Sequence, residues 1–208
     1  MSANSQFYYP NRMGRIIIHA LREVVGIENT KIVLNAAGLD IYSEQLPPAD
    51  LELSFPFEYV SALQAASESV FGVTDGQDIN RRVGRACLTS GLQEFNPLIG
   101  IADLPVRAMP LGLKLHVGFD MFAMVFNRFT DQVVRIGEEN SHYLWIIERC
   151  PVCWGRHVDS PSCQLAVGIL EESLAWATGG RSFDVTQVSC IAAGDPTCTI
   201  RINKRPVK

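Results

Sequence analysis

Apolar residues recur at spacings of three and four along most of the first 130 residues, the period of a helix that buries one face. This pattern predicts five helices, over residues 11–25, 30–37, 58–71, 75 or 78 to about 95, and 113–129. Gly26 and Gly38 are expected to end the first two helices. The pair Asn96-Pro97 is expected to break the fourth, and a proline-rich connection covers 44–57.

The pattern changes after residue 131, where runs rich in valine, isoleucine and aromatic residues predict strands. The expected elements are strands over 132–137 and 142–149, a helix over 162–177, and a hairpin with strands over 183–191 and 198–202. Helices followed by β-β-α-β-β predict an α+β fold. We expect it to resemble an α/β sandwich, in which an antiparallel sheet packs with N-terminal and C-terminal helices. We expect one domain over 1–208, with a helical part over about 11–130 and the β-β-α-β-β part over about 131–203.

The composition is that of a globular protein, with 47% hydrophobic residues, 19% charged residues and a net charge of -4. Basic residues cluster only in the segment 201–208, which is interpreted as a solvated tail, so the charge pattern argues against nucleic-acid binding. No apolar run reaches the roughly 18 residues of a membrane span, and the N-terminus lacks the pattern of a signal peptide. We therefore expect a cytoplasmic protein without a membrane span.

Six cysteines are present, and a cytoplasmic chain keeps them as thiols rather than as disulfides. Cys87 stands alone within a predicted helix, where it is interpreted as a small apolar core residue. The other five crowd into the last part of the chain: Cys150, Cys153, Cys163, Cys190 and Cys198. This crowding is the most informative feature of the sequence.

The spacing of these five cysteines favours a metal site. Cys150 and Cys153 form a Cys-x-x-Cys turn, which allows two thiolates to reach one ion. Cys163 begins a predicted helix, whose dipole favours the thiolate. Cys190 and Cys198 face each other across the last hairpin if its turn lies midway between them. Burial of the five as apolar residues, and redox chemistry at Cys150 and Cys153, are the alternatives.

The C-terminal cysteines also carry a resemblance to a known family. The segment 163–168 has a cysteine before a glycine-containing helix, and in 190–198 two cysteines flank a Gly-Asp turn with seven residues between them. Together these segments resemble the C-terminal signature of the 4-vinyl reductase domain family. The segment 11–15 is similar to the first helix of that family, so the resemblance covers most of the chain.

This resemblance implies a fold similar to that of transport-particle subunits and of bacterial sensors of aromatic hydrocarbons. Family members commonly form homodimers and enclose a hydrophobic ligand, and one branch is associated with bacteriochlorophyll synthesis. In the sensors, three cysteines and a glutamate hold a structural zinc ion, and the cysteines correspond to Cys163, Cys190 and Cys198.

The sequence departs from the sensors at the glutamate, whose place is taken by Gln187. Strand alternation puts Gln187 on the face opposite Cys190 unless a bulge intervenes. A thiolate from Cys150 or Cys153 is therefore expected to complete the site. Zinc is the expected ion, and an iron–sulfur cluster is the alternative.

One face of the helix predicted over 113–129 carries a stripe of aromatic residues: Phe119, Phe122, Phe126 and Phe129. Such a stripe suits a pocket for a flat apolar ligand, and it equally suits an ordinary helix-on-sheet core. His116 precedes the stripe and Trp145 lies in the following strand; the resemblance implies that a His and a Trp in this region hold the ligand's polar group. His116 is alternatively a ligand for the central metal of a tetrapyrrole. The expected ligand-binding residues are His116, Phe119, Phe122, Phe126 and Trp145.

No machinery for reduction stands out in the sequence. A Gly-x-Gly-x-x-Gly loop after a strand is missing, and no catalytic residues are assigned. The first hypothesis is therefore a non-enzymatic carrier or presenter of a tetrapyrrole, an intermediate of bacteriochlorophyll or chlorophyll synthesis. The second is a ligand-sensing regulatory module for small aromatic hydrocarbons, and the third is an enzyme that modifies a tetrapyrrole.

Overall fold

The computed structural model describes residues 6–99 and 109–207, without the side chains of 93–99. Its α-helices are α1 (Asn11–Val25), α2 (Ile27–Ala36), α3 (Phe57–Phe71), α4 (Val73–Ile99), α5 (Leu111–Phe129) and α6 (Gln164–Thr178). Two short 3-10 helices, η1 (Asp40–Ser43) and η4 (Ile191–Ala193), lie in connections. Within these ranges, no helix combines the length and the apolar character needed to cross a membrane.

The main sheet is antiparallel, and its strands lie in the order β3-β4-β6-β5. They are β3 (Val133–Glu138), β4 (His142–Arg149), β5 (Phe183–Ser189) and β6 (Cys198–Pro206). The predicted α+β class and antiparallel sheet are confirmed. A second sheet of two short strands, β1 (Tyr8–Pro10) and β2 (Leu53–Pro56), was not predicted, because strands of three and four residues are too short to show alternation.

Several helix boundaries differ from the prediction by a few residues, and two of these differences have a clear physical reason. α2 begins at Ile27 rather than near residue 30, because Gly26, with φ of +82°, ends α1 and lets the next helix start at once. α4 continues to Ile99, so the expected break at Asn96-Pro97 is wrong. A proline removes one backbone hydrogen bond and crowds one carbonyl group, which costs free energy. Near the end of a helix, the residues after the proline can still keep helical dihedral angles.

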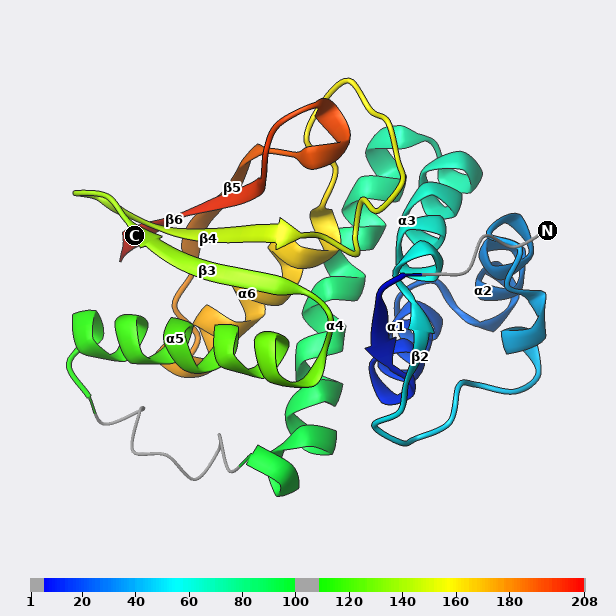
Figure 1. Ribbon diagram of the computed structural model, residues 1–208, viewed down its shortest axis with the longest axis horizontal. Helices are drawn as coiled ribbons and strands as arrows, with labels where there is room; N and C mark the ends of the chain where they lie inside the picture. The colour runs from blue at the N-terminus through cyan, green and yellow to red at the C-terminus, as the bar shows by residue number, and fades with distance from the viewer. Residues whose placement is uncertain (1–5, 100–108, 208) are drawn as a thin grey trace.

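Helices cover the main sheet on one face, as Figure 1 shows. α5 runs along β3, α6 packs against β5 and α4, and α1 and α3 pack against α4 in turn. Strand alternation directs apolar side chains towards these helices, and the buried ones are Val134, Tyr143, Trp145, Ile147, Val185, Ile200 and Ile202. One buried hydrophobic cluster therefore extends from the N-terminal helices to the sheet.

α4 and α6 approach each other so closely that their backbones touch. A Cβ atom at Gly84 would lie 2.2 Å from the Leu165 carbonyl oxygen, and one at Gly168 would lie 1.9 Å from the Arg81 carbonyl oxygen. Because backbone atoms cannot turn aside, only glycine permits this approach. Beside the contact, Glu171 of α6 forms an ion pair with Arg81 of α4. The glycine of the segment 163–168 is thus explained by helix packing.

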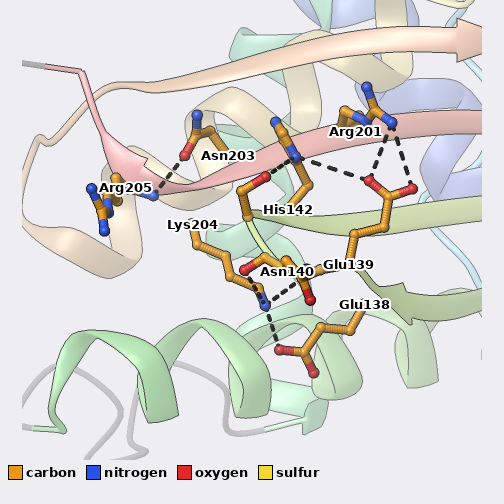
Figure 2. A network of polar contacts seen from close by, with 9 residues as sticks. Glu138, Glu139, Asn140, His142, Arg201, Asn203, Lys204 and Arg205 are labelled. Atoms are coloured by element: carbon orange, nitrogen blue, oxygen red, sulfur yellow. Dashed lines mark hydrogen bonds and ion pairs between the residues drawn. The ribbon is translucent and has the colours of Figure 1, made fainter.

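The turn between β3 and β4 is fastened to β6 by Lys204 (Figure 2). Its ammonium group donates hydrogen bonds to a Glu138 carboxylate oxygen at 2.7 Å and to the Glu139 carbonyl oxygen at 2.6 Å. Arg201 pairs with the Glu139 carboxylate at 3.1 Å. The basic segment 201–208 was expected to be a solvated tail, but residues 201–206 form most of β6, where Arg201 and Lys204 pair with acidic groups of the turn.

Candidate functional site: a thiol cluster beside an apolar cavity

The structure brings all five C-terminal cysteines together. The Cys153 and Cys198 sulfurs are 3.4 Å apart, and the Cys163 sulfur lies 3.7 Å from Cys150 and 3.8 Å from both Cys190 and Cys198. The Sγ atoms of Cys150, Cys153, Cys163 and Cys198 all lie within 4.8 Å of one another. All five side chains are buried. Metal binding by these cysteines stays a prediction.

Several connections of the C-terminal part converge to build this thiol cluster. The Cys-x-x-Cys turn follows β4, Cys163 immediately precedes α6, Cys190 follows β5, and Cys198 begins β6. In the β4–β6 pairing, Cys198 lies opposite Ile147, three residues before Cys150. Antiparallel pairing thus places cysteines that are far apart in sequence at one end of the sheet.

A β-bulge brings Gln187 to the thiol cluster. The β5–β6 register shifts between Gln187 and Ser189. This shift interrupts the alternation of side chains, which would have put Gln187 and Cys190 on different faces of the sheet. The Gln187 side-chain oxygen accepts a hydrogen bond from the Cys163 backbone N–H at 2.8 Å, and its amide nitrogen donates to the Ser189 carbonyl at 2.9 Å. Gln187 therefore holds the backbone that carries a thiol.

The Gly-Asp turn orders the two thiols that flank it. Gly194 has φ of +97°, a conformation that favours glycine. The Asp195 carboxylate accepts a hydrogen bond from the Cys190 backbone N–H at 2.7 Å. The Ile191 N–H donates to the Cys198 sulfur at 3.2 Å, and such a bond favours the thiolate form.

The spacing of the thiols fits one tetrahedral metal ion. With metal–sulfur bonds of about 2.3 Å, the sulfurs of a tetrahedral zinc site lie about 3.8 Å apart. Five sulfur pairs of the thiol cluster lie 3.4 to 4.0 Å apart, and the sulfurs of Cys150, Cys153, Cys163 and Cys198 all lie within 4.8 Å of one another. In an iron–sulfur cluster the cysteines are divided among two or more iron atoms, and sulfurs on different irons lie farther apart than sulfurs on one ion. The arrangement therefore suits a single ion better than a cluster.

Hydrogen bonds among the thiols shift the pKa values of different cysteines in opposite directions. Contacts with Cys150 foremost, and with the other thiols, hold the pKa of the Cys153 thiol below its usual range and raise the pKa of Cys163. One thiolate can be stabilised by hydrogen bonds from the neighbouring thiols, but several thiolates at this spacing repel one another. A divalent cation would allow all of its ligands to be thiolates at once.

An apolar cavity of about 120 Å³, the main cavity, lies between the helices and the sheet. Residues from α1, α4, α5, α6 and β4 line it, among them Met13, Ile16, Leu88, Phe122, Trp145 and Leu165. A second cavity of about 80 Å³ lies beside it. Leu88, Leu92 and Phe122 line both, so the two are separated by few side chains.

The residues predicted to bind a ligand are distributed between the two cavities and the surface. Phe122, Phe126 and Trp145 line the main cavity, and the Phe122 ring centre lies 5.4 Å from that of Trp145. Phe119 lines the second cavity. His116 lies on the exposed side of α5, next to an acidic residue one turn later, and lines neither cavity. Ligand binding by these residues stays a prediction.

Two polar residues of the main cavity were missed in the sequence. Tyr9 of β1 and Gln132, just before β3, both line it, and the Tyr9 hydroxyl donates a hydrogen bond to the Gln132 side-chain oxygen. Burial raises the pKa of Tyr9, so this hydroxyl stays neutral. The two residues are 123 positions apart, and no local pattern links them. Cys87, interpreted as a core residue, also lies in the wall, and burial raises its pKa.

The main cavity and the thiol cluster share chain segments. Val152 lies inside the Cys-x-x-Cys turn, and Leu165 and Ala166 lie in the first turn of α6 after Cys163; all three line the main cavity. One to three residues of backbone therefore separate these wall residues from the nearest thiol.

No protein-family model matches the chain, and no curated protein matches it. Among solved structures, it is similar to an Fe(II) unliganded H-NOX protein from K. algicida, with a TM-score of 0.59 and 9% identity over 96% of this chain and 97% of that one. An H-NOX protein from S. oneidensis in the Fe(II)NO ligation state gives a TM-score of 0.57 and 13% identity over 93% and 99% of the two chains.

A third solved structure is a trafficking protein particle complex subunit 3 from Naegleria fowleri, covalently bound to palmitic acid. Its TM-score is 0.53, with 12% identity over 72% of this chain and 95% of that one. Similarity at these identities shows the fold alone. It confirms the expected likeness to a transport-particle subunit, while the likeness to H-NOX proteins was not predicted. The chain therefore has the α+β fold that H-NOX proteins share with this trafficking-particle subunit.

Proposed function

We propose that this protein binds a hydrophobic small molecule in the main cavity, as a non-enzymatic carrier or presenter. The observation that supports this best is an apolar cavity walled by the rings of Phe122, Phe126 and Trp145. Aromatic faces around a buried apolar space suit a flat, hydrophobic ligand. A fold shared with proteins solved with Fe(II)NO and with palmitic acid is in keeping with such a role.

The first candidate ligand is a tetrapyrrole, in particular an intermediate of bacteriochlorophyll or chlorophyll synthesis. The resemblance to the 4-vinyl reductase domain family supports this, and so does the fold shared with H-NOX proteins, one of which was solved to probe heme distortion. A ligand of this size needs a pocket of at least about 300 Å³. The two cavities, of about 120 and 80 Å³, fall short of this even when joined, so Phe122 and further wall side chains must move. Tyr9, Met13 and Cys87 are wall residues that offer an axial atom to a central metal. His116 must turn inwards to do so.

The second candidate is a small aromatic molecule, bound by a ligand-sensing module. The main cavity of about 120 Å³ favours it, because this volume is close to that of an apolar cavity of about 150 Å³ that holds benzene. Such a module acts through a partner that reads its bound state. A ligand of this size needs a smaller rearrangement of the wall than a tetrapyrrole does.

We further propose that the thiol cluster holds one structural zinc ion. The sulfur–sulfur distances support it, as does a donor set made only of cysteines. A homodimer in the cytoplasm is proposed from the resemblance and from the use of reduced thiols. Light scattering at two protein concentrations tests the dimer: a mass of one chain at both would contradict it.

Binding is tested by calorimetric titration of untagged protein with protoporphyrin IX and, separately, with toluene. Ala166→Phe places a ring in the main cavity, and Ala175→Phe adds the same ring to the same helix outside both cavities. We expect one of the two ligands to bind the natural protein and the Ala175→Phe variant alike, and at least about tenfold more weakly to Ala166→Phe. Equal binding by the two variants, or no binding of either ligand, would contradict the proposal.

A further inference from the structure

Tyr9 and Gln132 form a polar corner of the main cavity. Tyr9 and Gln132 carry the only side-chain oxygen atoms among the described residues that line it, and none of those residues is charged. Both side chains are buried, with Tyr9 6% and Gln132 4% exposed. A polar pair at this depth in an apolar wall is unfavourable unless its hydrogen-bonding groups find partners.

The pair is only half satisfied by its internal hydrogen bond. The Tyr9 hydroxyl proton goes to the Gln132 side-chain oxygen, which leaves a lone pair on the Tyr9 oxygen and the two amide hydrogens of Gln132. Within the described part of the chain, the Gln132 amide nitrogen makes no hydrogen bond. One acceptor and one donor therefore lie side by side at the wall of the main cavity.

Neighbouring backbone holds this pair in place. The Tyr8 N–H donates to the Asp131 carboxylate at 2.8 Å, and the Asp131 N–H donates to the Tyr8 carbonyl oxygen at 3.1 Å. The Gln132 N–H donates to the Thr130 hydroxyl at 2.9 Å. Since each residue beside the pair is tied down, its two side chains are presented in a fixed arrangement, which lowers the entropy lost on binding.

We propose that Tyr9 and Gln132 select a neutral ligand that carries a hydroxyl group on an apolar ring. The hydroxyl oxygen accepts a hydrogen bond from the Gln132 amide, and the hydroxyl proton is donated to the Tyr9 oxygen. A ketone would satisfy only the amide. A carboxylate would be buried in a wall without a cationic side chain among its described residues. The proposal rests on the proposed function and specifies the ligand of that same cavity.

The experiment compares phenol with toluene, two rings of similar size of which only one has a hydroxyl, by calorimetric titration at pH 7. The quantity measured is the ratio of their association constants in each protein. Because the hydration of the two probes is the same in every titration, changes in this ratio between proteins report the polar corner alone. Gln132→Leu removes the amide, and Tyr9→Phe removes one oxygen and keeps the ring. Tyr143→Phe is the matched control, since its hydroxyl lies outside the main cavity.

We expect the phenol-to-toluene ratio to fall at least about tenfold in Gln132→Leu and to fall also in Tyr9→Phe, while Tyr143→Phe keeps the ratio of the natural protein. Benzoate is expected to bind more weakly than phenol. A ratio unchanged within about twofold in both variants, with toluene still bound, would overturn the selection of a hydroxyl and leave the cavity as a binding site. No binding of either probe to the natural protein would overturn both the selection and the small-aromatic form of the proposed function.

Discussion

Replacing Gly168 by alanine is expected to destabilise the protein, although alanine is the better helix former. The added Cβ atom would lie 1.9 Å from the Arg81 carbonyl oxygen, whereas ordinary contacts begin at 3.4 Å. The Cβ position is fixed by the backbone of α6 and the oxygen belongs to the backbone of α4, so the clash is relieved only when α4 and α6 move apart by about 1.5 Å. Overpacking of this severity costs about 3 kcal/mol, and the higher helix propensity of alanine offsets about 1 kcal/mol of it. The expected net loss is about 2 kcal/mol.

Gly91, in α4, provides the matched control, because a Cβ atom there meets no atom within 4 Å. Gly91→Ala is therefore expected to stabilise the protein by up to about 1 kcal/mol, from helix propensity alone. Urea unfolding of the natural protein and the two variants gives the free energies of unfolding, with circular dichroism as the signal. If Gly168→Ala were as stable as Gly91→Ala, α4 and α6 would not touch at Gly168, and the reasoning would be refuted.

Two further predictions concern the region of the thiol cluster. Cys198→Ser is expected to release the metal ion, because Cys198 belongs to the group of four close sulfurs. Cys190→Ser is expected to retain about one ion per chain. Metal analysis by mass spectrometry measures both, and loss of the ion from both variants would contradict this ligand set. Arg156→Met is expected to destabilise the protein by about 3 kcal/mol, because it leaves the Glu68 carboxylate, 12% exposed, without its partner. The double variant Arg156→Met with Glu68→Met is expected to recover most of that loss in urea unfolding, and a double variant as unstable as the single one would argue against a buried pair.

The thiol cluster was predictable because most of its determinants are local in sequence. The Cys-x-x-Cys turn brings two thiols together by itself, and a hairpin pairs the residues on either side of its turn. The sequence did not decide the role of Gln187. A bulge moves a side chain from one face of the sheet to the other, and the alternation of apolar and polar residues does not reveal it. Likewise, the segment 201–208 looked solvated, since the acidic turn that pairs with it lies about 60 residues earlier.

The polar corner of the main cavity was beyond the reach of the sequence for a different reason. Tyr9 and Gln132 meet because the backbone of β1 hydrogen-bonds to residue 131, a contact across more than half of the chain. Phe122 and Phe126 were identified from helical periodicity, yet periodicity assigns a residue to the buried face and cannot tell a filled core from a cavity. Whether space remains between the faces depends on how closely α4 and α6 approach, which is set by the glycines at their crossing.

Removing the metal ion is expected to weaken ligand binding, because the segments that carry the thiols also form part of the cavity wall. Val152 lies between two of the cysteines, and Leu165 follows a third by two residues. An ion that fixes these thiols holds both side chains in the binding-competent arrangement, and a coupling of this kind typically changes affinity by about 5- to 150-fold.

The coupling between metal binding and ligand binding is reciprocal, so it can be tested by two independent measurements. If chelation weakens toluene binding by some factor, saturating toluene must strengthen zinc binding by the same factor. Calorimetry of the metal-loaded and chelated protein gives the first factor, and competition with a zinc chelator, with and without toluene, gives the second. Circular dichroism must show that the chelated protein remains folded. Equal toluene affinity in both folded forms would mean that the ion stabilises the end of the sheet and leaves the cavity wall as it is.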